Sequence, residues 1–339
     1  MTGAAELSEH RRQLYIKRLR LAALLCLLLL AAALWRLGAG EWDIPAARVA
    51  ALLNPFLDEA SRATPEALVI RSVRLPRFLA AVGTGGLLAV AGAVLQGLLT
   101  NPLAEPYTLG IAAGAAFGGA LGFFFGSFAV TPMAFAGAMA ALWLVSLIAA
   151  RSGGGAAYIV LAGIITNAIL SAGVTFLKAI ADDRLSAIVL WLMGSLSGAS
   201  PLSALSVWGA ALILFIPAFI YARQIDAVSL SEGQGALLGI DEKKLRGLLL
   251  ALSSLATAAA VSFFGIIGFV GLVVPHLMRT FTGPATRPLL IFSFLGGGLL
   301  LALADGAAQN LGELPVGVIT ALIGGPFFCW ILMGRRRGA

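Results

Sequence analysis

Long apolar runs constrain this chain more than any other feature of its sequence. Runs of about twenty residues with few charges recur along most of its 339 residues. A helix of about twenty residues spans the ~30 Å hydrocarbon core of a bilayer and satisfies its backbone hydrogen bonds internally. A transmembrane β-barrel would need alternating segments of about ten residues, and the sequence shows none. The runs therefore predict an all-α membrane protein.

The apolar runs predict about ten transmembrane helices in a single transmembrane domain over residues 1–339. The chain is 60% hydrophobic and only 12% charged, whereas a soluble domain carries about a quarter charged residues. The expected spans are 21–38, 78–99, 108–126, 132–150, 158–180, 203–222, 247–264, 265–281, 288–304 and 315–333. An uncleaved first helix is the simpler interpretation of the basic segment 1–20 and the run after it. A cleaved signal peptide is the alternative.

The distribution of basic residues predicts the orientation. With the N-terminus inside and ten spans, inner segments hold fifteen Lys and Arg residues and outer segments hold eight. The positive-inside rule then places both termini in the cytoplasm. Segment 41–77 becomes an outer loop, and segment 223–246 becomes cytoplasmic. The second is expected to form two short helices, with Gly239 as a stop and Asp241 as an N-cap; they suit docking to a partner, and a solvated connector is the alternative.

Several classes of chemistry are excluded by what the sequence lacks. None of the four lysines follows a glycine, so the chain has no GxxxxGK[ST] loop for nucleotide phosphates. It has only two histidines and two cysteines, and it lacks HExxH and G-x-S-x-G. We therefore expect no metal site and no catalytic residue, which argues against an intramembrane enzyme. The formal charge of +7 sits mostly at the ends of apolar runs, which favours contact with lipid over nucleic acid.

Glycines are concentrated in the second and third expected spans. The chain has 41 glycines, and small residues let membrane helices approach closely where lipid supplies no hydrophobic drive. We expect the glycines of these spans to pack helix against helix. The set is Gly83, Gly85, Gly86, Gly92, Gly110, Gly114, Gly118, Gly119 and Gly122.

Three long motifs carry a resemblance to a known family. They are RLPRFLAAVGTGGLLAVAGAVLQGLLTNPLAEPYTLGIAAG at 74–114, GIIGFVGLVVPHLMR at 265–279 and ELPVGVITALIGGPFFCWIL at 313–332. In this order they closely resemble the FecCD-type permeases. Those proteins are the membrane subunits of type II ABC importers for ferric siderophores, haem and cobalamin.

The resemblance implies an assembly and a mechanism. It implies a homodimer of ten-helix subunits in the bacterial inner membrane, with the translocation path on the two-fold axis. Two copies of a separate ATPase would bind ATP and Mg²⁺ on the cytoplasmic face, and a periplasmic binding protein would deliver the substrate. The chain would move a large metal chelate by alternating access, with an iron chelate or haem favoured over cobalamin. An ion-coupled secondary transporter is the alternative, but it would need a carboxylate deep in a span.

The resemblance also implies roles for particular residues. Those matching the family's cytoplasmic gate are Asn101, Leu103, Ala156 and Ala157. Those matching its ATPase-coupling helices are Ser231, Glu232, Gly235, Ala236, Leu238 and Gly239. Those matching its outward-facing docking positions for the binding protein are Arg74, Arg77 and Gln309. Gly235 stands where the family commonly has alanine, which is expected to loosen the helix by about 1 kcal/mol.

Overall fold

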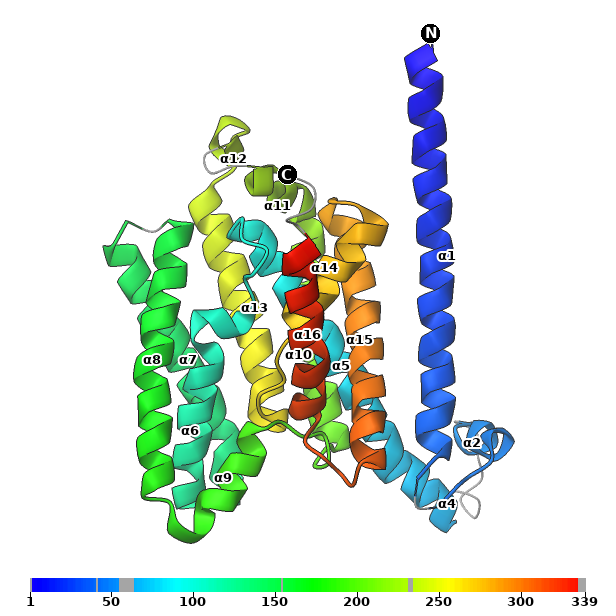
Figure 1. Ribbon diagram of the computed structural model, residues 1–339, viewed down its shortest axis with the longest axis vertical. Helices are drawn as coiled ribbons and strands as arrows, with labels where there is room; N and C mark the ends of the chain where they lie inside the picture. Colours follow the sequence, from blue (N-terminus) through cyan, green and yellow to red (C-terminus); the bar gives the residue numbers. More distant parts are fainter. Residues whose placement is uncertain (1, 41, 55–63, 154, 231–233, 335–339) are drawn as a thin grey trace.

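The computed structural model describes residues 2–40, 42–54, 64–153, 155–230 and 234–334. This part of the chain forms helices and no strand, and seven of its helices are long and apolar enough to cross a membrane. Long apolar runs therefore fold as the sequence predicts, and the protein is a multi-pass α-helical membrane protein. Figure 1 shows the long helices running side by side along one direction.

The expected spans each overlap one helix longer than ten residues. These helices are α1 (Thr2–Gly38), α5 (Leu75–Leu98), α6 (Ile111–Phe125), α7 (Ser127–Arg151), α8 (Ala156–Ala179), α10 (Pro201–Ile220), α13 (Glu242–Phe264), α14 (Val270–Thr282), α15 (Thr286–Asn310) and α16 (Val316–Gly334). The shorter elements are α2 (Ala46–Leu52), α4 (Pro65–Leu68), η1 (Val69–Arg74), η2 (Pro106–Leu109), η3 (Asp182–Arg184), α9 (Leu185–Leu192), α11 (Ala222–Leu230) and α12 (Gln234–Leu237).

Two of these helices are shorter than the sequence predicts. Helix α6 has 15 residues and begins after Gly110, whose φ of +77° is left-handed. Helix α14 has 13 residues and begins only at Val270, because 265–269 is not helical. At about 1.5 Å per residue they are roughly 23 and 20 Å long, short of the ~30 Å core. Both therefore start next to irregular backbone.

Segment 41–77, predicted as an outer loop, is more helical than expected in its described residues, 42–54 and 64–77. It contains α2, and its second half forms α4 and the π-helix η1, which continue into α5 as one helical span, Pro65–Leu98. Thr64 caps this span, since its hydroxyl accepts a hydrogen bond from the backbone N–H of Ala67 at 3.4 Å. The short helix α9 was not predicted either.

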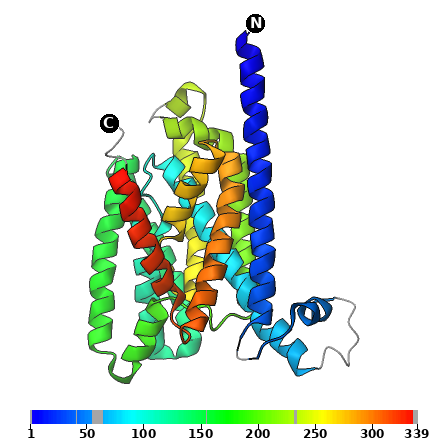
Figure 2. The ribbon, with the colours of Figure 1, turned by 45° about the vertical axis from the view of Figure 1, so that its right-hand side comes forward.

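The two ends of the bundle carry different elements. In Figures 1 and 2 the N-terminus, the end of α16 and helices α11 and α12 lie at one end, which we call the inner end. Helices α2, α4 and α9 lie at the other, which we call the outer end. Helix α1 runs along one side of the bundle against α15, and its first turns project beyond the other helices.

Glycines bring the helices into backbone contact, as the sequence predicts. A Cβ built on Gly92 of α5 would collide with the carbonyl of Gly271 in α14, and one on Gly85 would collide with that of Gly297 in α15. Gly114 of α6 meets α7 in the same way. Helix α5 is buried along almost its whole length and forms the centre of the bundle. These contacts confirm that glycine acts here in helix packing.

Candidate functional site

The two irregular segments, 99–110 and 265–269, are fastened together in the bundle. The hydroxyl of Tyr107 donates to the carbonyl of Ile267 at 2.8 Å and accepts from its N–H at 3.2 Å. The side-chain amide of Gln96 donates to the carbonyls of Gly271 and Leu272 at 3.3 and 3.4 Å. Irregular backbone is tolerated at membrane depth only where protein satisfies its polar groups. Tyr107 supplies part of that satisfaction, and Gln96 joins α5 to the start of α14 beside it.

Sequence reasoning missed Gln96 and Tyr107. Both lie inside the motif at 74–114, and each is a polar side chain in a strongly apolar stretch. That contrast was the available signal, because a buried polar group needs a hydrogen-bond partner. The partners lie 160 residues or more away along the chain, so the sequence alone did not reveal them.

Two of the four predicted gate residues lie in the first irregular segment, and the other two lie at the start of α8. The side-chain oxygen of Asn101 accepts from the N–H of Leu103 at 2.9 Å, and the Leu103 side chain is exposed. Ala156 is buried at the start of α8, in the same apolar cluster as Leu109, and Ala157 is exposed. Segment 99–110 packs on α8 through Gly163, where a Cβ would collide with the carbonyl of Thr108. The gate role of the four residues stays a prediction.

Glu105 is an unusual carboxylate in this segment. Its Oε2 is buried and has no hydrogen-bond partner among the described residues. Burial raises the pKa of Glu105 to about 7, because a low-dielectric environment disfavours the charged form. The segment next to the predicted gate therefore holds a carboxyl group that titrates near neutral pH.

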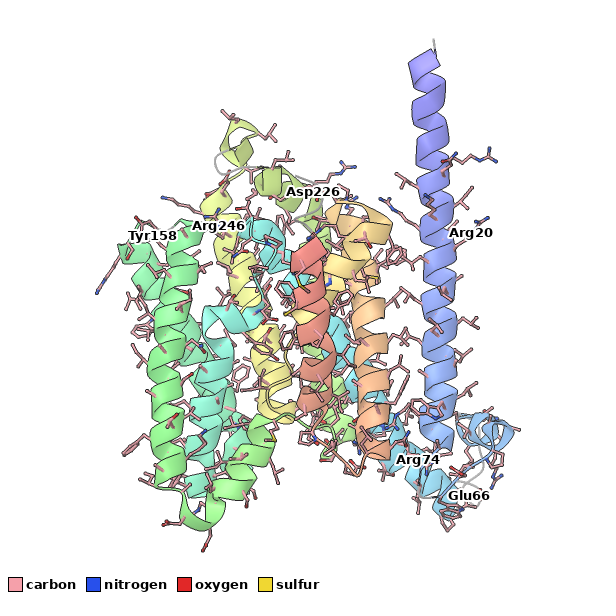
Figure 3. The ribbon with its side chains drawn as sticks, in the orientation of Figure 1. Arg20, Glu66, Arg74, Tyr158, Asp226 and Arg246 are labelled. Atoms are coloured by element: carbon pink, nitrogen blue, oxygen red, sulfur yellow. The ribbon has the colours of Figure 1, made fainter. Side chains whose placement is uncertain are left out.

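The predicted coupling segment is joined to two helices of the bundle. Ile225 of α11 is fully buried. It packs closely on Gly97 of α5, because a Cβ built on Gly97 would lie only 2.7 Å from Cγ2 of Ile225. Asp226 accepts a hydrogen bond from the backbone N–H of Thr286 at 2.8 Å. Thr286 is the first residue of α15, so the carboxylate satisfies one of the free N–H groups of that helix. Figure 3 shows Asp226 at the inner end.

The local structure predicted for this segment is confirmed at Gly239 and Asp241. Gly239 has a left-handed φ of +75° after α12, and Asp241 caps α13 by accepting from the N–H of Lys244 at 3.1 Å. Ser231 and Glu232 lie outside the described residues. Gly235 and Ala236 belong to α12, and the side chains of Leu237 and Leu238 are 86% and 70% exposed.

The structure gives a reason for glycine at position 235. Gly235 is buried, and a Cβ there would lie 2.6 Å from Oε1 of Glu242 and 3.0 Å from the side chain of Val228. Alanine would require the Glu242 side chain to move. The glycine therefore exchanges intrinsic helix stability for a closer packing of α12 against its neighbours.

Charged side chains form a cluster at the outer end, which we call the outer ion cluster: Arg36, Arg77, Asp305 and Glu313. Asp305 is 1% exposed and accepts from Arg36 at 2.9 Å and from Arg77 at 2.9 Å. Arg77 also contacts Glu313 at 3.0 Å, and Glu313 is 57% exposed. The expected span 288–304 stopped just before Asp305, but α15 continues to Asn310 and buries it. A buried carboxylate is therefore present, and two arginines neutralise it.

The two arginines predicted to dock the binding protein both have partners within the chain. Arg74 donates to the carbonyls of Leu37 and Gly38 at 2.8 Å each and to that of Trp42 at 2.7 Å. It thereby caps the C-terminal end of α1, whose last carbonyls have no intrahelical partner. Arg77 belongs to the outer ion cluster, and Gln309 is half-buried in α15. Figure 3 shows Arg74 at the outer end; docking by these three residues stays a prediction.

Comparison with known proteins identifies relatives along nearly the whole chain. The FecCD transport family matches residues 25–334. A cobalamin import system permease protein of Halobacterium salinarum is 40% identical, covering 79% of this chain and 74% of the relative. A probable iron chelatin transport system permease protein of Helicobacter pylori is 38% identical, covering 80% of this chain and 84% of the relative.

A solved structure shows the same fold. It is described as an inward-facing conformation of a putative metal-chelate type ABC transporter, and it superposes with a TM-score of 0.81. It is 33% identical and covers 91% of this chain and 97% of its own. The family match spans the motifs at 74–114, 265–279 and 313–332. This chain belongs to the FecCD transport family and is a membrane permease of the ABC importer type.

Proposed function

We propose that this chain is the membrane-spanning subunit of an ATP-driven importer that moves a large metal chelate into the cytoplasm. The observation that carries the proposal is the inner-end surface formed by Leu237 and Leu238, on a segment anchored to α5 and α15. Exposed leucines outside the apolar spans favour a protein partner. The sequence has no phosphate-binding loop of its own, so the partner that binds ATP and Mg²⁺ is a separate ATPase, present in two copies.

The proposal includes the full assembly. Ten spans with both termini in the cytoplasm would place α11 and α12 on the cytoplasmic side of the bacterial inner membrane. A second copy of this chain would complete the translocation path. The periplasmic binding protein would dock at the outer end, over Arg74, Arg77 and Gln309. Asp305 neutralises Arg77. The exposed charge at this position is therefore Glu313, which would also face the binding protein.

The contacts of the coupling segment support a mechanical role. A movement of the ATPase would reach α15 through Asp226 and α5 through Ile225. Helix α5 leads directly into segment 99–110, which carries Asn101 and Leu103 of the proposed gate. Ala156 and Ala157, at the start of α8, belong to the same proposed gate. ATP can shift the equilibrium only if its binding differs between the inward- and outward-facing states. The chain supplies the path and the lever, with no chemistry on the substrate.

The substrate class follows from the relatives and is held here as a proposal. An iron chelate or haem is favoured over cobalamin. All three are large, so selection would rest mainly with the binding protein. Binding of a ferric hydroxamate, haem and cyanocobalamin to the cognate binding protein, measured by fluorescence quenching, ranks them directly.

The proposal is tested by uptake into proteoliposomes. We expect one of those three probes to accumulate only when the ATPase, the binding protein and ATP are all present. Uptake driven by an ion gradient without ATP would contradict the proposal. Leu238→Asp should abolish co-purification of the ATPase, because it charges an apolar contact. Leu311→Asp, at an exposed leucine of the outer end, is the matched control and should leave co-purification unchanged.

Glu105 favours one second candidate, an ion-coupled secondary transporter. A carboxyl group with a buried Oε2 and a pKa of about 7 is the kind of group that proton-coupled transporters use. In that case a pH gradient alone would drive uptake, and Glu105→Gln would abolish it. Under the proposed function, Glu105→Gln leaves ATP-driven uptake dependent on ATP.

Glu105 also predicts a pH-dependent stability. Its pKa is raised from 4.5 in the unfolded chain to about 7 in the folded protein. Stability from the protonated carboxyl is therefore complete below pH 4.5 and is lost as pH rises through 7. The full effect is about 3 kcal/mol. We expect the wild-type melting temperature to fall by a few degrees more than that of Glu105→Gln between pH 5 and 8. Parallel melting curves would contradict this.

A further inference from the structure

A groove at the inner end lies between α7 and α13, near the start of α8. Its volume is about 480 Å³. Most of its wall is apolar, including Leu142, Val145, Ile159 and Leu250. Two basic residues of α13, Lys243 and Arg246, line it as well, and none of the described lining residues is acidic. Figure 3 shows Arg246 at the same level of the bundle as Tyr158, in the first turn of α8.

Arg246 is a buried cation whose hydrogen bonds are incomplete. The residue is 8% exposed, and its Nε has no hydrogen-bond partner in the described part of the chain. Among the described residues its ion-pair partner is Glu242, at 4.0 Å, which is too long for a hydrogen bond. A guanidinium taken out of water is costly unless it is paired and hydrogen-bonded. The groove therefore contains an arginine that lacks a close anionic partner.

Gly247 provides open space next to this arginine. It lines the same groove, and no described atom lies within 4 Å of a Cβ built on it. Gly92 and Gly114 in the bundle interior are instead in backbone contact with a neighbouring helix. Gly247 therefore leaves open space in the groove wall. The same groove is lined by the apolar Leu250 and by the basic Lys243 and Arg246.

We propose that this groove binds one anionic phospholipid, with its phosphate on Arg246 and Lys243 and an acyl chain along the apolar wall. Guanidinium groups bind phosphate oxygens in a bidentate manner. Basic pockets between helices at the cytoplasmic side suit anionic headgroups. A small free anion would leave the apolar wall uncovered, whereas a phospholipid matches both parts of the groove and surrounds the protein at high concentration.

The test is native mass spectrometry of the purified full-length chain after delipidation. Phosphatidylglycerol, phosphatidylcholine and inorganic phosphate are added separately. We expect one phosphatidylglycerol per chain, bound at least about fivefold more tightly than phosphatidylcholine. Arg246→Gln should weaken phosphatidylglycerol binding by about fivefold, and Gly247→Leu should weaken it for both lipids by filling the wall.

Two control variants separate the site from general effects. Lys244→Gln removes a neighbouring charge whose side chain is 87% exposed and paired with Asp241. Gly209→Leu places a leucine in α10, where a Cβ also meets no described atom within 4 Å. Both should bind phosphatidylglycerol like the wild type. If Arg246→Gln does not fold, Gly247→Leu decides, since its added side chain enters open space.

Three outcomes would overturn the proposal. Equal binding of phosphatidylglycerol and phosphatidylcholine would show that Arg246 and Lys243 do not select an anionic headgroup. Binding of inorganic phosphate as tight as that of phosphatidylglycerol would remove the role of the apolar wall. Unchanged lipid binding by Gly247→Leu would show that the lipid does not occupy this groove.

Discussion

Asp305→Ala is expected to abolish accumulation of folded protein in the membrane. The substitution leaves Arg36 and Arg77 facing each other, and these side chains are only 7% and 11% exposed. Removing one partner of a buried ion pair costs about 3–5 kcal/mol, and here two cations lose the same anion. Fluorescence-detected size-exclusion chromatography of a tagged chain, with a thermal melt of any soluble fraction, measures the effect.

Glu313→Ala is the matched control for this prediction. Glu313 contacts the same Arg77 guanidinium but is 57% exposed, so its loss should cost only about 0–1 kcal/mol. Normal folding of Asp305→Ala with impaired docking of the binding protein would contradict the prediction. That result would mean that Arg77 acts mainly on the partner and that Asp305 is not needed to hold the outer ends of α1, α5 and α15 together.

Gly92→Ala is expected to give the second large effect. The added Cβ would collide with the backbone carbonyl of Gly271, and backbone cannot rotate away as a side chain can. Helices α5 and α14 must separate, at a cost of about 1–3 kcal/mol or more. Separation also stretches the hydrogen bonds from Gln96 to α14. We expect a lowered melting temperature and loss of ATP-driven uptake.

Gly209→Ala should change stability in the opposite direction. No described atom lies within 4 Å of its Cβ, so alanine there should stabilise α10 by roughly 0.5–1 kcal/mol. The two variants make the same chemical change in a helix interior. A melting temperature that rises in both would mean that the contact between Gly92 and Gly271 does not constrain the bundle.

Local patterns in the sequence predicted much of the fold. The apolar runs located the long helices, because bilayer thickness sets their length. Gly239 and Asp241 located the end of α12 and the start of α13, because a left-handed residue and an N-cap act within a few residues. Glycine clusters predicted close packing in α5 and α6. Each of these features depends on residues that are close together in the sequence.

What the sequence left open depends on partners distant along the chain. Arg77 and Asp305 are 228 residues apart, and their pairing changed Arg77 from a free docking charge into part of a buried cluster. Helix α6 proved short because Gly110 follows a segment that is fastened through Tyr107 to 265–269. Ser231 and Glu232 lie outside the described residues, so their coupling role rests on the resemblance alone.

The continuous span Pro65–Leu98 has a thermodynamic consequence. At about 1.5 Å per residue its 34 residues reach roughly 50 Å. It carries Arg77 in its outer half and Gly97, against α11, at its inner end. If nucleotide binding inside changes how strongly the periplasmic partner is held, linkage requires that partner to change nucleotide affinity by the same factor. Measuring nucleotide affinity with and without the periplasmic partner gives this coupling free energy from either side of the membrane.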